Sequence, residues 1–264
     1  MQRVVSRQNP RIIEARRLAQ SSRDRRKAGR CVLEGDHIIA VYCDRVGAPE
    51  TLVVVEEALA DPHIAALVAR IPPEQALAVP ASLFAEISAL SPDVGVLAVI
   101  DTPRPAVPPP GRLCLLLDDL QDPGNVGTIL RTAAAAGVDQ VLLSKHCAFA
   151  WSPKVLRAGQ GAHFLTVIVE DVDLPAWVAG FRRDGGEVAA LVATAGTDLY
   201  ATPLHAPLAL VIGNEGAGIS PALAALADQR VTIPMPGGME SLNAAAAAAV
   251  ALFECVRRGL EQHR

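Results

Sequence analysis

Two short apolar runs near the C-terminal end limit most strongly the folds that this chain can adopt. Each run ends in a loop of glycine, proline and small polar residues, and a helical pattern follows each loop. The runs begin the stretches L-A-L-V-I-G-N-E-G-A-G-I-S, from residue 208, and V-T-I-P-M-P-G-G-M-E-S-L-N, from residue 231. In an open α/β sheet, ligands bind beyond the carboxyl ends of the strands, where such loops collect. We therefore expect these two loops to form a ligand site.

The same alternation of apolar runs and helical patterns extends back to residue 113. Expected strands lie at 112–117, 140–144, 164–169, 187–193 and in the two runs above, and expected helices lie at 126–137, 153–158, 175–183 and about 241–257. Continuous apolar strands between helices are typical of a parallel sheet that is covered on both faces. The C-terminal half is therefore predicted to be an α/β domain.

A smaller αβ unit precedes this domain. Its expected strands lie at 31–34, 51–55, 76–79 and 94–100, with helical patterns between them. The stretch D-T-P-R-P-A-V-P-P-P-G-R, residues 101–112, holds five prolines. Such a run is stiff and extended and acts as a semi-rigid spacer. The predicted organisation is an N-terminal domain over 1–101, a linker over 102–112 and a second domain over 113–264.

The charges are distributed unevenly along the chain. Residues 1–30 hold ten Lys and Arg and two acidic residues, a net charge of +8, whereas the remaining residues carry −12, which leaves −4 overall. A basic arm on an acidic body favours a polyanionic partner for the arm. A solvated, loosely ordered terminus would carry the same charges.

Composition also indicates where the protein acts. No apolar run approaches the roughly 18 to 20 residues that a membrane span needs, and the N-terminus lacks the apolar segment of a secretory signal. Five cysteines form no C-x-x-C pair, which favours reduced thiols in a cytoplasmic protein over a zinc site or disulfides. We expect a cytoplasmic protein with no membrane contact.

Several common enzyme classes lack their signatures in this sequence. No G-x-G-x-x-G follows the first strand of either domain, and G-x-x-x-x-G-K-[ST], H-E-x-x-H and G-x-S-x-G do not occur. The six histidines show no ligand spacing. We therefore expect no bound metal, no dinucleotide and no serine nucleophile.

Three clusters could carry chemistry: D-P-G-N-V-G-T-I-L-R (122–131), I-G-N-E-G-A-G-I-S (212–220) and I-P-M-P-G-G-M-E-S-L-N (233–243). Taken singly, each has a structural interpretation. Asn125 and Ser241 fit helix caps, Glu215 fits an exposed turn, and Arg131 fits an ordinary paired side chain.

Together, in this order and spacing, the clusters resemble the SpoU (TrmH-like) family of SPOUT methyltransferases. That family carries N-x-G-x-x-x-R after the first strand, a G-N-E-G-x-G loop, and I-P-M and S-L-N before a small-residue helix. The resemblance covers residues 113 to 254, and no motif position departs from the pattern. Residues 1–100, with S-R-Q-N-P-R-I and C-V-L-E-G-D, are similar to the substrate-binding domain that precedes many members.

The resemblance implies methyl transfer from S-adenosylmethionine to a ribose 2′-hydroxyl of RNA. It also implies a C-terminal trefoil knot that holds the cofactor, and a homodimer with the knot regions at its interface. Carried over position by position, it assigns cofactor contacts to Thr194, Gly213, Ile233 and Leu242. It assigns catalytic or substrate-site positions to Asn125, Arg131, Glu215, Ser241 and Asn243. RNA would bind through the basic N-terminal domain.

The resemblance leaves alternative functions open. The long N-terminal domain favours ribosomal RNA of the 23S type over transfer RNA, because the tRNA enzymes of the family more often use short basic extensions. A non-catalytic RNA- or ribosome-binding protein that retains the knot is a third possibility, against which the complete set of site residues argues.

Overall fold

The computed structural model describes residues 1–90 and 92–261 and divides into two compact units. The first unit contains Met1–Pro103 and Trp151–Phe164, and the second contains Arg104–Ala150 and the residues from Leu165 onward. The predicted domain boundaries place Trp151–Phe164 in the C-terminal domain, so the structure groups this segment differently. The linker stays a prediction, and its residues 102–111 contain no helix or strand.

The first unit is built on a five-stranded mixed sheet with the order β1-β4-β3-β5-β2. Strands β1, β4 and β3 run parallel, and β5 is antiparallel to both β3 and β2. The strands are Gln2–Arg3 (β1), Arg30–Glu34 (β2), Thr51–Val55 (β3), Ala76–Val79 (β4) and Val96–Asp101 (β5).

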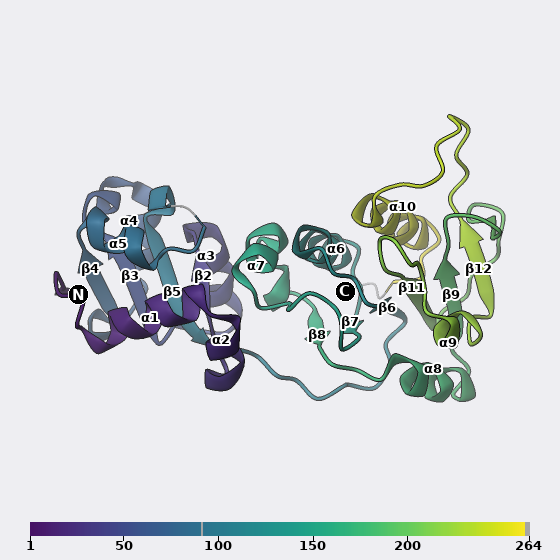
Figure 1. The fold of residues 1–264 in the computed structure, drawn as a ribbon, viewed down its shortest axis with the longest axis horizontal. Coiled ribbons are helices and arrows are strands. Elements are labelled where there is room, and N and C mark those ends of the chain that lie inside the picture. Colours follow the sequence, from purple (N-terminus) through teal and green to yellow (C-terminus); the bar gives the residue numbers. More distant parts are fainter. Residues whose placement is uncertain (91, 262–264) are drawn as a thin grey trace. The chain divides into compact units, whose positions relative to one another are not determined.

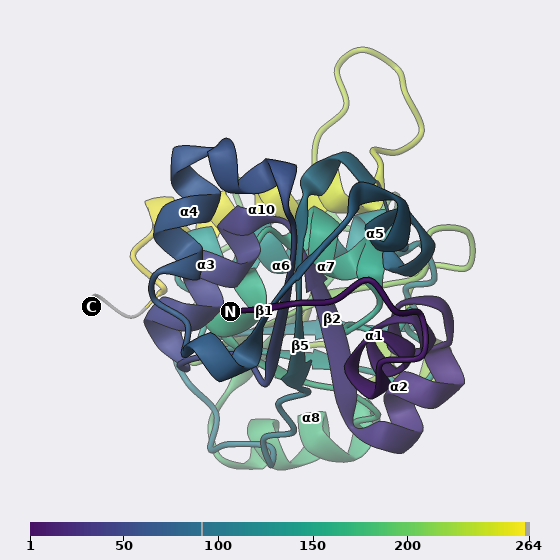
Figure 2. The same ribbon diagram turned by 90° about the vertical axis from the view of Figure 1, so that its left-hand side faces the viewer.

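Helices cover both faces of this sheet. Figure 2 shows α3 and α4 on one face and α1, α2 and α5 on the other. The helices of the unit are Pro10–Gln20 (α1), Ser22–Ala28 (α2), Asp36–Arg45 (α3), Pro62–Val68 (α4), Ala81–Ile87 (α5) and Pro153–Gly159 (α7). Short 3-10 turns lie at Glu57–Ala60, Pro73–Gln75, Pro92–Val94 and Ala162–Phe164.

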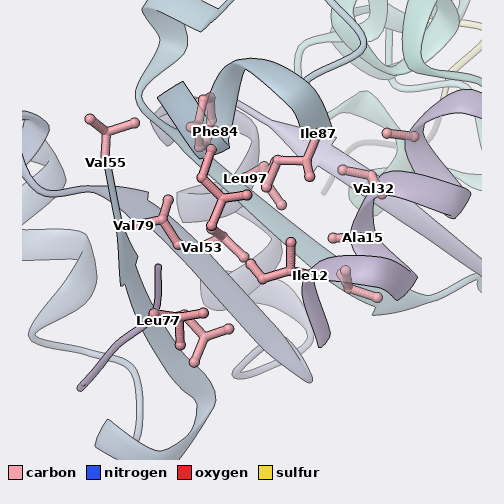
Figure 3. Packing of buried hydrophobic residues seen from close by; sticks show 14 of the residues in the cluster. Ile12, Ala15, Val32, Val53, Val55, Leu77, Val79, Phe84, Ile87 and Leu97 are labelled. Atoms are coloured by element: carbon pink, nitrogen blue, oxygen red, sulfur yellow. The ribbon is translucent and has the colours of Figure 1, made fainter. Parts of the chain in front are cut away.

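The first thirty residues are part of this folded core rather than a loose arm. Asn9 caps α1 by accepting a hydrogen bond from the backbone N–H of Arg11, and Pro10 occupies the first helical turn. Ile12 and Ala15 then lie with Phe84 in one apolar cluster (Figure 3), to which Leu18 also belongs. The prediction of helical spacing here is confirmed, whereas the interpretation as a loosely ordered terminus is wrong.

Many of the basic side chains in this segment are used inside the fold. Arg30 pairs with Glu14, Glu50 and Asp101. The buried Arg25 guanidinium donates to the carbonyl oxygens of Leu18 and Ala19. Acidic partners also face Arg3, Arg7 and Arg16. The charge available to an external polyanion is therefore smaller than +8.

The second unit is built on a seven-stranded sheet with the order β10-β12-β9-β11-β6-β7-β8, in which all neighbours run parallel (Figure 1). The strands are Leu113–Leu117 (β6), Gln140–Leu143 (β7), Val167–Val169 (β8), Glu187–Leu191 (β9), Thr197–Asp198 (β10), Leu208–Ile212 (β11) and Gln229–Thr232 (β12). The two central strands, β6 and β11, are buried along their whole length. The predicted fold class, a parallel α/β sheet preceded by a smaller αβ domain, is confirmed, and the trefoil knot stays a prediction.

Helices also cover both faces of the second sheet. Pro123–Ala135 (α6) and Ala244–Arg257 (α10) pack together on one face. Leu174–Arg183 (α8) and the short Pro221–Ala224 (α9) lie on the other, where they contribute to an apolar cluster with the strands (Figure 1). No described helix is both long and apolar enough to cross a membrane.

The strand order reverses between the central strands β6 and β11, which makes this a topological switch point. From β6 the chain continues to β7 and β8 on one side, and it then returns to β9, β11 and β12 on the other. The carboxyl ends of β6 and β11 therefore lie where the order reverses, and ligands of parallel sheets bind in the crevice at such a point.

Candidate active site

A cavity of about 520 Å³ opens at the carboxyl ends of β9, β11 and β12. Its volume lies within the roughly 300–1,000 Å³ that small-molecule sites occupy. Its walls combine apolar side chains with glycine backbone and a few polar groups. The lining residues are Leu191, Val192, Ala193, Ile212, Gly213, Asn214, Glu215, Gly216, Gly218, Ile219, Ile233, Met235, Ser241, Leu242, Asn243, Ala244 and Ala247.

Most of the predicted site residues meet in this cavity. Six of them line it: Gly213, Glu215, Ile233, Ser241, Leu242 and Asn243. The last three come from the end of a loop that connects β12 to α10 and extends away from the sheet (Figure 1). Thr194 is exposed and is not a lining residue, although its neighbour Ala193 is. Asn125 and Arg131 also lie outside the lining.

Gly213 is required by the close approach of the backbone on the other side of its loop. A Cβ atom at this position would lie 2.3 Å from the carbonyl carbon of Gly218 and 2.4 Å from the backbone nitrogen of Ile219. Contacts of that length do not occur in real structures, so a side chain would push the loop apart. The residue therefore allows the cavity wall to turn sharply after β11.

Asn214 organises the same loop from within. Its backbone exchanges two hydrogen bonds with Gly218, and its side-chain Oδ1 accepts from the N–H groups of Gly216 and Ala217, each at 2.9 Å. Sequence reasoning assigned no role to Asn214. The available signal was an Asn directly after a glycine in a glycine-rich stretch, which is typical of a tight turn stabilised by its own side chain.

Glu215 connects this loop to the start of α6. Its carboxylate accepts hydrogen bonds from the backbone N–H groups of Gln121 and Asp122 and from Asn125 Nδ2, at 3.0 to 3.3 Å. Partial burial raises the pKa of Glu215, but the hydrogen bond from Asn125 and those from backbone N–H groups outweigh it, so that the pKa lies below its ordinary value. Glu215 is therefore an anionic anchor at neutral pH.

Asn125 and Asn243 extend this connection to α10. Asn243 Nδ2 donates to Asn125 Oδ1 at 2.9 Å, and Asn243 Oδ1 accepts from the N–H groups of Ala245 and Ala246. Asn243 is thus the N-cap of α10, and Asp122 is the N-cap of α6. The interpretation of Asn125 and Ser241 as helix caps is wrong, because α6 is capped by Asp122 and α10 by Asn243.

Arg131 lies away from the cavity. It is exposed on α6, six residues after Asn125, which corresponds to about 9 Å along a helix axis. Its side chain makes no hydrogen bond or ion pair with any residue that the structure describes. The structure therefore does not bring Arg131 into contact with the other predicted catalytic residues.

The donor set of the cavity fits a ligand that is partly apolar and partly polar. Leu191, Ile233 and Leu242 offer apolar surface, while the loops around Gly213 offer backbone hydrogen-bonding groups. S-adenosylmethionine combines an adenine ring with a charged methionine portion, and a site of this character fits both parts. Within residues 1–90 and 92–261, no group of three or more His, Cys, Asp or Glu residues could hold a metal ion; His263 lies outside them.

Comparisons with known protein families match both parts of the chain. Residues 112–253 match the model of the SpoU rRNA Methylase family. Residues 9–98 match the MRM3-like substrate binding domain.

Similarity to individual proteins extends over nearly the whole chain. The 23S rRNA (guanosine(2553)-2'-O)-methyltransferase RlmP of Bacillus subtilis (strain 168) is 30% identical over 258 residues, which cover 96% of this chain and 98% of that protein. The solved structure of the SpoU methyltransferase AviRb from Streptomyces viridochromogenes, in complex with the cofactor AdoMet, has a TM-score of 0.83 at 28% identity and covers 97% of this chain and 100% of its own. The AdoMet-bound rRNA methyltransferase from Sinorhizobium meliloti has a TM-score of 0.82 at 28% identity and covers 99% of both chains.

Proposed function

Because the chain belongs to the SpoU rRNA methylase family, we propose that it methylates a ribose 2′-hydroxyl of ribosomal RNA with S-adenosylmethionine. The observation that carries this proposal is the cavity at the carboxyl ends of β9, β11 and β12, whose walls include the two loops bearing the C-terminal family motifs. The named relative acts on 23S rRNA, and two solved neighbours bind AdoMet. Ribosomal RNA of the 23S type is therefore the proposed substrate.

The cavity residues would hold the methyl donor. Gly213 and Ile233 would contact it largely through backbone groups, and Leu242 would cover it with apolar surface. When bound, S-adenosylmethionine supplies a methyl group that is already activated on a sulfonium. The task left to the protein is to align the ribose oxygen and to ease the loss of its proton, and orientation of this kind contributes up to roughly 7–11 kcal/mol in the best cases.

The polar residues outside the apolar walls would orient the RNA. Asn125 and Asn243 are held rigidly by their mutual hydrogen bond and by Glu215, and Ser241 lies exposed at the cavity rim. A guanidinium such as that of Arg131 is a poor base. Its proposed role is to bind the phosphate next to the target ribose and to stabilise the developing alkoxide, while the phosphate shares the departing proton.

The first unit would bind the RNA backbone. Arg17, Arg23 and Lys27 are exposed on α1 and α2 and have no acidic partner among the described residues. Such cations can displace counterions from phosphates, which supplies affinity without sequence specificity. The proposed location of the enzyme is the cytoplasm, where it would meet ribosomal RNA.

A homodimer is also part of the proposal. The outer face of α10 presents Ala246 and Phe253 to solvent, and Phe253 is 50% exposed. A second copy of the chain would cover this apolar stripe and would lie close to the cavity, because Ala244 and Ala247 of the same helix line it.

The test combines calorimetry with mapping of methylation. The purified protein should bind S-adenosylmethionine and add 2′-O-methyl groups to ribosomal RNA transcripts, with little modification of tRNA in the same assay. Methylation of tRNA alone would replace the ribosomal proposal. Cofactor or RNA binding without any methyl transfer would instead identify a non-catalytic RNA-binding protein.

A further inference from the structure

The cavity wall formed by residues 213–220 is held from outside by the loop that follows β6. Asp118, which is buried, accepts a hydrogen bond from the backbone N–H of Ser220 at 2.7 Å. The next residue, Asp119, accepts one from Asn214 Nδ2 through its backbone carbonyl, also at 2.7 Å. These two contacts hold the two ends of the glycine-rich wall, so its shape depends on the backbone conformation at Asp118 and Asp119.

Asp119 has an unusual backbone conformation. Its φ angle is 55°, in the left-handed region that residues with a Cβ atom adopt less readily than glycine. With β6 fixed in the centre of the sheet, a return of this residue to negative φ would rotate the carbonyl that Asn214 contacts. The hydrogen bond from Asn214 to the Asp119 carbonyl therefore forms when φ of Asp119 is positive and is lost when φ is negative.

Ser144 makes the contacts that favour the left-handed conformation. It follows β7, and its hydroxyl oxygen accepts a hydrogen bond from the backbone N–H of Asp119 at 2.8 Å. The same hydroxyl donates to Asp119 Oδ1 at 2.5 Å. One side chain thus satisfies both the backbone and the carboxylate of Asp119, although Ser144 itself does not line the cavity.

We propose that Ser144 is a positioning residue for the cofactor site. Its hydroxyl fixes the left-handed conformation of Asp119, the Asp119 carbonyl fixes the Asn214 amide, and Asn214 fixes the turn that walls the cavity. This inference rests on the proposed function, because it assumes that the cavity binds S-adenosylmethionine.

The test measures S-adenosylmethionine affinity by calorimetry in two backgrounds. Ser144→Ala should raise the Kd about fivefold, because the left-handed conformation loses its support. Asp119→Gly keeps the backbone carbonyl that Asn214 contacts. Glycine adopts positive φ readily, so it does not need support from the Ser144 side chain. In the Asp119→Gly background, Ser144→Ala should therefore raise the Kd by much less than fivefold, because only the hydrogen bond from the backbone N–H of residue 119 is left to lose. A merely structural serine would lower affinity equally in both backgrounds, because independent effects add.

Each outcome is decisive. An unchanged Kd in Ser144→Ala, equal losses in both backgrounds, or loss of binding in Asp119→Gly alone would overturn the inference. Thermal unfolding of each variant reports whether it has folded. If the wild-type protein itself fails to bind S-adenosylmethionine, the proposed function is refuted instead.

Discussion

Arg131 is exposed on α6, and its guanidinium makes no contact that would hold it in place within the described part of the chain. A cation in this setting loses little by binding a ligand, because no existing ion pair has to be broken. Because Arg131 does not line the cavity, its proposed role is toward the RNA rather than the cofactor. Its contribution should therefore appear in methyl transfer and not in cofactor binding.

Replacement of Arg131 by Ala should nearly abolish methyl transfer. Loss of one group that stabilises developing charge costs about 100-fold or more in kcat, whereas the Kd for S-adenosylmethionine should stay at its wild-type value. Single-turnover methylation and calorimetry measure the two quantities. Thr128→Ala, on the same exposed face of α6, is the matched control and should retain activity. Substantial turnover in Arg131→Ala would refute the role.

Gly213→Ala should weaken the binding of S-adenosylmethionine. The added Cβ would meet the backbone of Gly218 at 2.3 Å, so the loop must move and the cavity wall must open. We expect at least a tenfold increase in the Kd for S-adenosylmethionine, about 1.4 kcal/mol. Gly237→Ala is the control, because a Cβ atom there would meet no atom within 4 Å and should leave the Kd unaltered. Equal affinities of the two variants would contradict this account of the wall.

At the scale of secondary-structure elements, α10 is joined to the loop that follows β10. Glu254, which is buried, accepts hydrogen bonds from Arg257 and Arg258. Arg258 in turn donates to the carbonyl oxygens of Leu199, Tyr200 and Thr202. The hydrogen bonds from Arg257 lower the pKa of Glu254 to about 2, against an opposing effect of burial and with further help from Arg258. The carboxylate therefore keeps the helix and the loop together.

Glu254→Gln should destabilise the protein by about 1–3 kcal/mol at neutral pH. Because the pKa of the folded state is depressed, the ionised carboxylate stabilises the fold above the unfolded-state pKa of about 4.3, and this stabilisation is lost as the pH falls towards about 2. The difference in unfolding free energy between the two proteins should therefore shrink from pH 5 to pH 3. Denaturant titrations at several pH values measure it.

Glu240 provides the control for this experiment. It is exposed in the loop before α10, so Glu240→Gln should change the unfolding free energy little at any pH. A difference between wild type and Glu254→Gln that stays constant from pH 7 to pH 3 would show that lost packing, not lost charge, accounts for the effect.

Most elements could be predicted from the sequence, while their ends could not. Helix α10 was expected from about residue 241 and begins at Ala244, because Asn243 is its cap. Helix α6 was expected from 126 and begins at Pro123 after the Asp122 cap. Apolar periodicity defines the buried face of a helix, but caps depend on side chains that several neighbouring polar residues could provide. The two-residue strand β10 has no apolar pattern and was not expected.

At the scale of the whole molecule, part of the positive charge of the N-terminal segment is used in folding. Deletion of residues 1–30 would remove Ile12, Ala15 and Leu18 from the core and would therefore test stability rather than RNA binding. Point substitutions of cations that lack acidic partners separate the two effects.

The triple substitution of Arg17, Arg23 and Lys27 to Gln should weaken RNA binding and reduce its salt dependence. Loss of up to three phosphate contacts lowers the slope of log K against log salt concentration by about 2. The control replaces Arg3, Arg7 and Arg70, which are paired with Glu56, Glu86 and Asp44, and it changes the net charge equally. Filter binding at several salt concentrations compares them. If the slope of log K against log salt concentration were the same in the two variants, overall charge rather than these three cations would account for RNA binding.

The site residues that lie within short sequence motifs could be predicted from the sequence. Gly213, Ile233 and Leu242 lie in loops whose composition already indicated a ligand site, and they do line one cavity. The contacts of Asp119 with Ser144 and Asn214 join segments that are 25 and 95 residues apart. No local pattern encodes such pairings, because they arise from strand order and from the direction in which each strand ends.

All of the cavity-lining residues lie between Leu191 and Ala247. A ribosome that synthesises this protein must therefore pass residue 247, after both sheets have been translated, before any cofactor site can exist. Incomplete chains released before this point would contain the first unit but not the complete cavity.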